Sequence, residues 1–145
     1  RTLAMTTTNR TLAIRRALAQ GAEHLAAGAF LNLSAVAAWV RAHGGPALVV
    51  CAGWKGAVNL EDTLFAGALV QVLAPDFRPA SDAALAARHL WAAAVADPFG
   101  FLQESSHVQR LANLDAGLRR DVQFCLEADH YAVVPEWREE ALVAA

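Results

Sequence analysis

Residues 47–56 read ALVVCAGWKG, an apolar run that ends in a glycine-rich loop. Every residue from Ala47 to Ala52 is apolar, which is typical of a strand covered on both faces of a parallel sheet. The two glycines of the loop allow the backbone to approach a ligand closely. The stretch therefore predicts a buried strand whose carboxyl end opens into a binding loop.

Three other short runs indicate strands, namely Leu3–Thr6, His24–Phe30 and Ala132–Pro135. Apolar residues recur at three- and four-residue spacings between and after these runs, which predicts helices. The predicted helices span residues 11–20, 33–43, 60–74, 82–96, 106–114 and 118–128. Strands that alternate with helices through short loops indicate βαβ units. We therefore expect a single α/β domain over residues 1–145, a three-layer α/β/α fold with a mainly parallel sheet and a helical C-terminal part.

The composition argues against several classes of protein. Apolar residues make up 56% of the chain and charged residues 18%, which argues against disorder. The net charge of −2 and the lack of a basic stripe argue against a nucleic-acid binder. The longest strongly apolar runs, such as Leu64–Ala74, are shorter than the roughly 20 residues that span a bilayer. With no signal peptide and no CxxC pattern at Cys51 or Cys125, we predict a cytoplasmic protein with two free thiols.

Polar loops follow the first two predicted strands. Ligands of open α/β sheets bind outside the carboxyl ends of the strands. The first loop is Thr7-Thr8-Asn9-Arg10-Thr11, whose hydroxyls, amide and following helix N–H groups suit an oxyanion such as phosphate. The same side chains could instead only cap the helix. The second loop, Phe30–Ser34, has a similar character, and capping is the favoured interpretation there.

Acidic residues follow the third loop, which is the glycine-rich loop that ends at Gly56. Glu61 and Asp62 begin a predicted helix after Asn59, where they could simply be favourable first-turn charges. They could also hold a hard cation such as Mg²⁺, which prefers oxygen ligands. Lys55 could meet an anion or remain in solvent. We expect Cys51 to be a small buried residue rather than a nucleophile.

One histidine stands out in the helical part. His107 follows two serines at a predicted helix start, and we interpret it as functional. The remaining histidines are interpreted as structural: His24, His43, His89 and His130. Asp121, Cys125 and Asp129 are spaced by four residues and would share one face of a helix that continued so far. No Walker A, GxSxG, HExxH or dinucleotide motif names a reaction, so the residues alone indicate an α/β domain with an anion-binding edge beside acidic groups.

Four blocks of the chain resemble, in order, those of the 2-phosphosulfolactate phosphatases. They are TTNRT at 7–11, FLNLSAVA at 30–37, CAGWKG at 51–56 with LEDTLFAGA at 60–68, and DVQFC at 121–125. The third block is the most specific, and together the blocks extend over almost the whole chain. The resemblance implies a cytoplasmic, Mg²⁺-dependent hydrolysis of 2-phosphosulfolactate, or a similar small phosphoester, to sulfolactate and phosphate. In methanogens this step belongs to coenzyme M biosynthesis.

The resemblance also implies which residues form the site. As catalytic residues we expect Glu61, Asp62 and His107. As substrate-binding residues we expect Thr7, Thr8, Asn9, Asn32, Gly53 and Gly56. As Mg²⁺ ligands we expect Glu61, Asp62, Asp121 and Asp129. The expected partner is a small anionic phosphoester, with neither nucleic acid nor membrane, and the chain could form a homodimer.

The chain departs from the family pattern in three places. Arg10 and Val108 stand where the family usually has glycine, which could narrow a loop or change the substrate. An N-terminal DxLRAT-like motif of the family is absent. Since Arg1 leads directly into a predicted strand, we interpret the chain as the C-terminal portion of a longer enzyme, and the isolated portion could be inactive.

Two other functions compete with a phosphatase. A non-catalytic anion- or nucleotide-binding domain could keep the fold without the chemistry, and Arg10 favours this interpretation because a fixed cation binds an anion without helping its release. A structural or oligomerisation module could instead place Trp39, Trp91 and Trp137 at a subunit interface.

Overall fold

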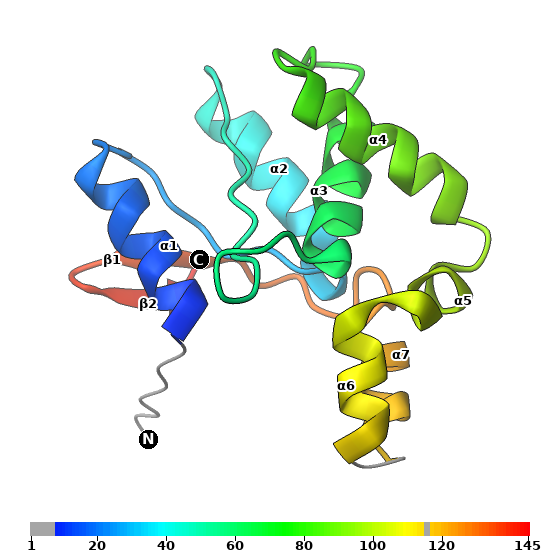
Figure 1. Cartoon of the computed structure of the whole chain (residues 1–145). Helices are drawn as coiled ribbons and strands as arrows, with labels where there is room; N and C mark the ends of the chain where they lie inside the picture. Colours follow the sequence, from blue (N-terminus) through cyan, green and yellow to red (C-terminus); the bar gives the residue numbers. More distant parts are fainter. Residues whose placement is uncertain (1–7, 115–116) are drawn as a thin grey trace.

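Helices account for most of the computed structural model, which describes residues 8–114 and 117–145 (Figure 1). The α-helices are α1 (Thr8–Ala19), α2 (Leu33–His43), α3 (Leu60–Leu73), α4 (Asp82–Ala94), α5 (Pro98–Phe101), α6 (Ser106–Leu114) and α7 (Leu118–Cys125). Two 3₁₀ helices, η1 (Phe30–Asn32) and η2 (Leu102–Glu104), precede α2 and α6. The strands β1 (Pro135–Arg138) and β2 (Ala141–Ala144) follow α7. Each predicted helix is therefore confirmed, with ends that differ by a few residues.

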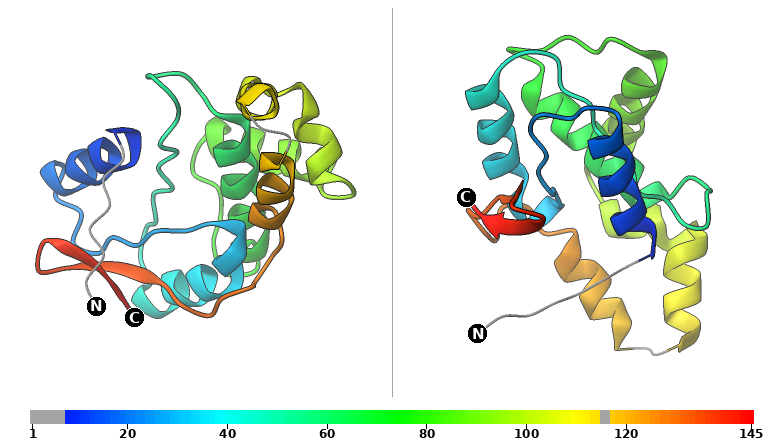
Figure 2. Two further views of the ribbon diagram at one scale, coloured as in Figure 1. Left: turned by 90° about the horizontal axis from the view of Figure 1, so that it is seen from below. Right: turned by 90° about the vertical axis from the view of Figure 1, so that its left-hand side faces the viewer.

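The expected three-layer α/β/α fold with a mainly parallel sheet is wrong. In the described residues the sheet consists of β1 and β2, which pair antiparallel with Pro135 opposite Ala144 and Arg138 opposite Ala141. Figures 1 and 2 show this hairpin at the side of the molecule that lies away from α4 and α5, not between two layers of helices. The last predicted strand, Ala132–Pro135, overlaps β1 only at its final residue.

The apolar run Ala47–Ala52, predicted as the central strand, joins no sheet among the described residues. Its side chains lie largely on the surface, with Leu48 87% and Val50 51% exposed. A central strand needs a neighbour on each side to pair its backbone N–H and C=O groups. No described segment takes either place, and Leu3–Thr6, the other strand predicted nearby in sequence, lies outside the described residues. The prediction was wrong because apolar residues indicate burial but cannot supply the neighbouring strands.

The predicted strand His24–Phe30 is also wrong, because this segment makes only an isolated antiparallel bridge and Phe30 belongs to η1. Ala26 makes an antiparallel bridge with Glu136. The Ala27 N–H donates to the Pro135 carbonyl at 2.8 Å, and the Trp137 N–H donates to the Leu25 carbonyl at 2.8 Å. Residues 25–27 therefore line the free edge of β1 and connect the segment after α1 to the C-terminal hairpin.

The core lies around α3, which packs against α4 on one side and α2 on the other. Leu64 of α3 and Leu102 of η2 are fully buried there. Gly67 allows α3 and α4 to come close, because a Cβ atom at this position would lie 2.0 Å from the Ala87 carbonyl oxygen. This close packing fixes the first turn of α3 relative to the helices that follow it.

Aromatic side chains extend the core toward η1. The Phe30 ring lies 5.7 Å from the Phe65 ring and 5.3 Å from the Trp91 ring, measured between centroids. Trp39 and Trp91 are partly buried against this core, and Trp137 is half-buried on β1. The first two tryptophans therefore have a packing role within the chain, and an interface role for the three stays a prediction.

Helix α1 stands apart from the other helices. The extended segment that leads to Gly53 lies between α1 and α3 in Figure 1 and in the left view of Figure 2. Thr8, Asn9 and Arg10 lie in the first turn of α1 and not in a loop, while Thr7 lies outside the described residues. A bilayer-spanning helix is not found in the described part of the chain, where every helix is too short or too polar.

Candidate functional site

A tight turn precedes α3. The Trp54 N–H donates to the Ala57 carbonyl at 3.0 Å, and the Ala57 N–H donates to the Trp54 carbonyl at 2.9 Å. The corner residues Lys55 and Gly56 have φ angles of 50° and 78°, as a type I′ turn requires. Lys55 is not glycine and therefore carries backbone strain, which is common at binding and catalytic sites.

Asp62 ties this turn to the first turn of α3. The Gly53 N–H donates to the Asp62 Oδ2 at 2.8 Å. Gly53 itself has a φ of 65°, and a Cβ atom there would lie 2.4 Å from the Ala57 carbonyl oxygen. Only glycine fits this position without a shift of the backbone, which explains why the loop needs it.

Glu61, the neighbour of Asp62, faces α6. Its Oε1 lies 3.6 Å from the His107 Nδ1. Its Oε2 is buried and makes no hydrogen bond with any described residue. A buried carboxylate oxygen without a partner is destabilising unless a proton or a cation satisfies it. The Glu61 carboxylate therefore fits the role of an oxygen ligand to Mg²⁺.

Arg110 determines which nitrogen of His107 carries the proton. The Arg110 Nη2 lies 2.7 Å from the His107 Nδ1. A guanidinium group can only donate, so Nδ1 accepts and the neutral imidazole has its proton on Nε2. Ser105 helps to hold His107 in the first turn of α6, because its Oγ accepts the Val108 N–H at 3.1 Å.

Trp54 gathers two cationic side chains on this side of the molecule. The Arg110 Cζ lies 4.4 Å and the Lys55 Nζ 5.8 Å from the centroid of its ring. Stacking on an aromatic face holds a guanidinium in place and adds a modest cation–π attraction. The site therefore combines two carboxylates, one imidazole and two cations near the N-termini of α3 and α6.

Sequence reasoning missed Arg110 and gave Trp54 no role. The spacing of Arg110 from His107 was a usable signal, since residues three apart on a helix are neighbours. Trp54 gave no such signal, because its contact with Arg110 joins two distant parts of the chain.

The Cys51 thiol lies next to this cluster. Burial raises its pKa, and the nearby Asp62 carboxylate raises it further. Cys51 as a whole residue is nevertheless exposed, so the prediction of a small buried residue is wrong. A raised pKa keeps the thiol protonated at neutral pH and makes it a poor nucleophile. The expectation that Cys51 does not attack the substrate stays a prediction.

Asn32 and Asp129 have structural contacts of their own. The Asn32 Oδ1 accepts the Ala29 N–H at 2.8 Å, and its Nδ2 donates to the Val133 carbonyl at 2.9 Å. The Asp129 carboxylate accepts the backbone N–H and the hydroxyl of Ser34, both at 2.6 Å, which caps the start of α2. Their predicted substrate and metal roles stay predictions.

The other expected site residues lie in different surroundings. Asp121 is exposed in the first turn of α7, and Asn9 is half-buried in the first turn of α1. Gly56 is a corner of the tight turn, where a Cβ atom would meet nothing within 4 Å. Glu61, Asp62, His107, Gly53 and Gly56 are thus brought into one cluster, whereas the contacts found in the described structure do not join Asp121, Asp129 or Asn32 to it.

Comparisons with known proteins point to one family. A family model described as 2-phosphosulpholactate phosphatase matches residues 1–140. A protein of Pseudothermotoga lettingae named "Probable 2-phosphosulfolactate phosphatase" is 38% identical over 140 residues, 96% of this chain and 58% of its own length. Proteins of the same name from Thermosynechococcus vestitus and Symbiobacterium thermophilum are 36% and 34% identical over 92% and 99% of this chain.

These relatives are considerably longer than the chain. The chain spans 56% of the Thermosynechococcus vestitus protein and 60% of the Symbiobacterium thermophilum protein. The matched part contains the tight turn and the first turns of α3 and α6, so all residues of the cluster fall within the shared region.

Proposed function

Because the chain belongs to the 2-phosphosulpholactate phosphatase family, we propose that it carries the Glu61–His107 cluster as part of the active site of a Mg²⁺-dependent phosphatase. The substrate in this proposal is 2-phosphosulfolactate or a similar small phosphoester, and the products are sulfolactate and phosphate. The observation that carries the proposal is the buried Oε2 of Glu61, which makes no hydrogen bond with a described residue although Glu61 lies beside His107, the partner of Arg110.

The charges of the cluster suit such a substrate. 2-Phosphosulfolactate has a phosphate, a sulfonate and a carboxylate on a small carbon frame. Arg110 and Lys55 both lie over the Trp54 ring, where they can pair with two of these anionic groups. A guanidinium binds planar or tetrahedral oxyanions through two N–H groups at once. The exposed indole of Trp54 would hold both cations toward the same ligand.

In this proposal the Glu61 and Asp62 carboxylates bind the metal ion. Mg²⁺, when bound through Glu61 and Asp62, would neutralise charge on the phosphoryl oxygens and polarise the phosphorus toward attack. Asp62 would keep its second function of holding the Gly53 N–H, which couples the metal ligand to the shape of the turn. The predicted ligands Asp121 and Asp129 are not needed in this arrangement.

His107 is the proposed proton donor. In the hydrolysis, water adds to the phosphorus and the ester P–O bond breaks, so the leaving alkoxide of sulfolactate must gain a proton. The Nε2–H of the imidazole can supply it, and the imidazolate left behind would be stabilised by the Arg110 guanidinium that donates to Nδ1. The water that became part of the phosphate provides the proton that restores Nε2–H.

The proposal also includes a cellular location and an oligomeric state. We place the enzyme in the cytoplasm, where free thiols such as Cys51 and Cys125 persist, and relate its product to coenzyme M biosynthesis or an analogous route to sulfonates. A homodimer remains part of the proposal.

Phosphate release from 2-phosphosulfolactate tests the function. We expect release that requires Mg²⁺ and stops with EDTA, and a lower rate on 2-phospholactate, which lacks the sulfonate. Because the chain spans only part of its relatives' length, the assay is made on the chain and on a full-length form. Failure of the full-length form to release phosphate from either substrate would refute the proposal, and equal rates on both would refute sulfonate recognition alone.

A further inference from the structure

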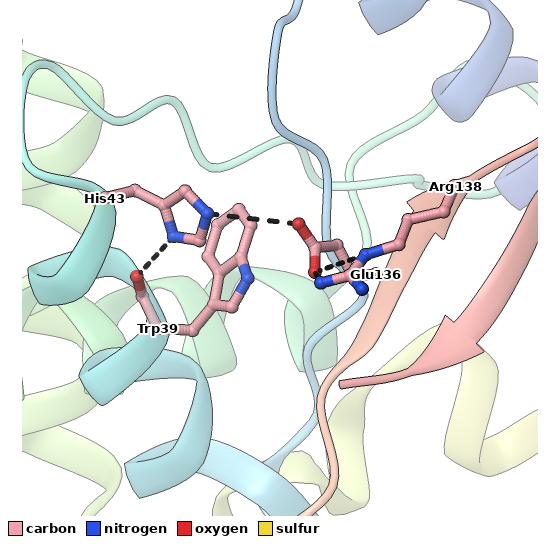
Figure 3. Close-up of polar contacts among 4 residues, drawn as sticks. All are labelled: Trp39, His43, Glu136 and Arg138. Atoms are coloured by element: carbon pink, nitrogen blue, oxygen red, sulfur yellow. Dashed lines mark hydrogen bonds and ion pairs between the residues drawn. The ribbon is translucent and has the colours of Figure 1, made fainter.

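Two histidines that the sequence indicated as structural meet a buried glutamate outside the proposed active site. His24 follows α1, His43 is the last residue of α2, and Glu136 lies on β1. One ligand atom from each of the three side chains lies within 4.8 Å of the others, and no second group of this kind is found in the described part of the chain. The three side chains come from three separate segments, and Figure 3 shows His43 and Glu136 facing each other.

His43 is held in the tautomer that leaves a lone pair free. Its Nδ1 lies 2.8 Å from the Trp39 carbonyl oxygen. A carbonyl can only accept, so Nδ1 carries the proton and donates. The Nε2 lone pair then points toward the Glu136 Oε1 at 3.9 Å (Figure 3). Histidine ligands of metals characteristically have their other ring nitrogen bonded in this way.

Glu136 is oriented in a similar manner. Its side chain is only 9% exposed, and its Oε2 accepts the Nε and Nη2 of Arg138 at 3.1 and 2.5 Å. Its other oxygen, Oε1, remains directed at His43. A lone pair and a carboxylate oxygen that face each other repel unless a proton or a metal cation lies between them.

The third ligand completes the set. The His24 ring lies 4.4 Å from the His43 ring, centroid to centroid, at an interplanar angle of 55°. Ligand atoms bound to a tetrahedral Zn²⁺ at 2.0–2.1 Å lie roughly 3.3–3.4 Å apart. The present spacing needs a contraction of about 1.5 Å or less, which rotations of the exposed His24 and His43 side chains can provide.

We propose that His24, His43 and Glu136 bind a divalent metal ion of the Zn²⁺ class, with water at the open coordination position. Two imidazoles and one carboxylate form a known ligand set for Zn²⁺, whereas Mg²⁺ prefers oxygen ligands throughout. The bound ion joins the end of α2, the segment after α1 and the C-terminal hairpin. The site is therefore a metal staple, separate from the Glu61–His107 cluster.

Calorimetric titration of Zn²⁺ into the metal-free chain tests the site. The protein carries Cys51→Ser and Cys125→Ser, because thiolates also bind Zn²⁺. We expect one equivalent to bind tightly, and a rise in the thermal unfolding midpoint, since a metal at 100 times its Kd favours the folded state about 100-fold. Failure to bind an equivalent with micromolar affinity would overturn the proposal.

Variants locate the bound ion. His24→Ala removes an exposed ligand without a change in the core, and we expect it to weaken Zn²⁺ binding at least about tenfold. Glu136→Gln keeps the shape of the side chain and should weaken binding as well. The matched control is His89→Ala, an exposed histidine of α4, which should leave affinity unchanged. Equal affinities for His24→Ala and His89→Ala would overturn the assignment.

A further variant separates the two clusters. Glu61→Gln removes the charge from the proposed active site, and we expect Zn²⁺ to bind this variant as tightly as the parent. Co²⁺ bound in place of Zn²⁺ should give the strong visible absorption of four-coordinate cobalt, which His24→Ala should abolish. Loss of tight binding in Glu61→Gln with retention in His24→Ala would place the ion at the other cluster and refute the staple.

Discussion

The two histidine–carboxylate clusters lie at opposite ends of helices. His107 and Glu61 occupy the first turns of α6 and α3, where the helix dipole gives a positive potential that favours anions. His43 is the last residue of α2, where carbonyl groups favour cations. Helix polarity therefore favours the anionic phosphoester at the first cluster and opposes a cation there, so a Mg²⁺ ion at that cluster depends on the Glu61 and Asp62 carboxylates, whereas at the second cluster helix polarity and Glu136 both favour a cation.

The two imidazoles also differ in the partner of Nδ1. Arg110 donates to the Nδ1 of His107, which leaves Nε2–H as a proton donor. The Trp39 carbonyl accepts from the Nδ1 of His43, which leaves Nε2 as a metal ligand. The same residue type thus acquires opposite chemistry from the group that holds its other nitrogen. A substitution in one cluster should leave the function of the other cluster unchanged, so the second cluster serves as an internal control.

The largest effect is expected for Asp62→Asn. Loss of this carboxylate should lower Mg²⁺-dependent phosphate release in the full-length protein by about 100-fold or more. Loss of a first-turn charge should lower the free energy of unfolding by only about 0.3–1 kcal/mol. Zn²⁺ affinity at the His24 cluster should not change. Steady-state kinetics at varied Mg²⁺ concentration measures the loss of activity, and urea unfolding measures the loss of stability. If the Mg²⁺ dependence is unaltered, Asp62 acts only as a favourable charge in the first turn of α3.

Arg110→Ala should have the next largest effect. A lost hydrogen bond to a charged group is worth about 1.5–3 kcal/mol, which corresponds to roughly a 10- to 150-fold increase in the KM for 2-phosphosulfolactate. The matched control is Arg10→Ala, whose side chain is exposed in the first turn of α1. If Arg10→Ala raises KM and Arg110→Ala does not, the anion binds at residues 7–11, as the sequence first indicated.

Glycine substitutions test the turn that positions the carboxylates of the first cluster. Gly56→Ala places a side chain in open space at a φ of 78°, so it should lower the free energy of unfolding by about 1–2 kcal/mol. Gly53→Ala should cost more, since its Cβ would also meet the Ala57 carbonyl. It should also weaken Mg²⁺-dependent activity, because the Gly53 N–H holds Asp62. Thermal unfolding and activity assays measure these effects. Equal losses of stability and activity in Gly53→Ala and Gly56→Ala would contradict the role given to Gly53.

The smallest effect concerns Cys51. Its raised pKa means that little thiolate exists at neutral pH, so labelling by a thiol reagent should be slow and should accelerate as the pH rises toward that raised value. Asp62→Asn removes the second cause of the shift, and labelling of Cys51 at fixed pH should become a few-fold faster, since a pKa change of one unit alters the thiolate fraction by about tenfold. Mass spectrometry separates Cys51 from Cys125.

Activity of Cys51→Ala completes this test. If Cys51 does not attack the substrate, its replacement by alanine should retain most of the turnover. Fast labelling of the parent together with abolished turnover of Cys51→Ala would instead identify the thiol as a nucleophile and would contradict a mechanism in which water attacks the phosphorus.

Local sequence signals predicted the helices and several residues of the site. Ser81 immediately precedes the predicted helix over residues 82–96, and its Oγ accepts the Ala84 N–H at 3.3 Å. Glu61, Asp62 and His107 were chosen from their positions at helix starts, and the structure brings Glu61 and His107 to 3.6 Å. These signals succeed because periodicity and capping depend on residues a few positions apart.

The sheet could not be predicted in the same way. Ala47–Ala52 has the composition of a central strand, yet it has no partner strand among the described residues and stays largely exposed. Within the predicted strand His24–Phe30, only Ala26 bridges to β1, at Glu136, which follows more than a hundred residues later. Strand pairing depends on segments that are distant in the sequence. An apolar run or an alternation of apolar residues therefore indicates a tendency to form a strand but does not identify the partner strand.

By itself, the sequence determined the helices, the glycines of the tight turn and the carboxylates that begin α3, because each follows from local backbone preferences. Tertiary structure alone decided that Glu61 lies beside His107 and that His24, His43 and Glu136 meet. Those contacts join segments far apart along the chain, and their chemistry depends on distances of a few ångströms. No spacing in the sequence encodes such distances; the packing of α2, α3 and the C-terminal hairpin sets them.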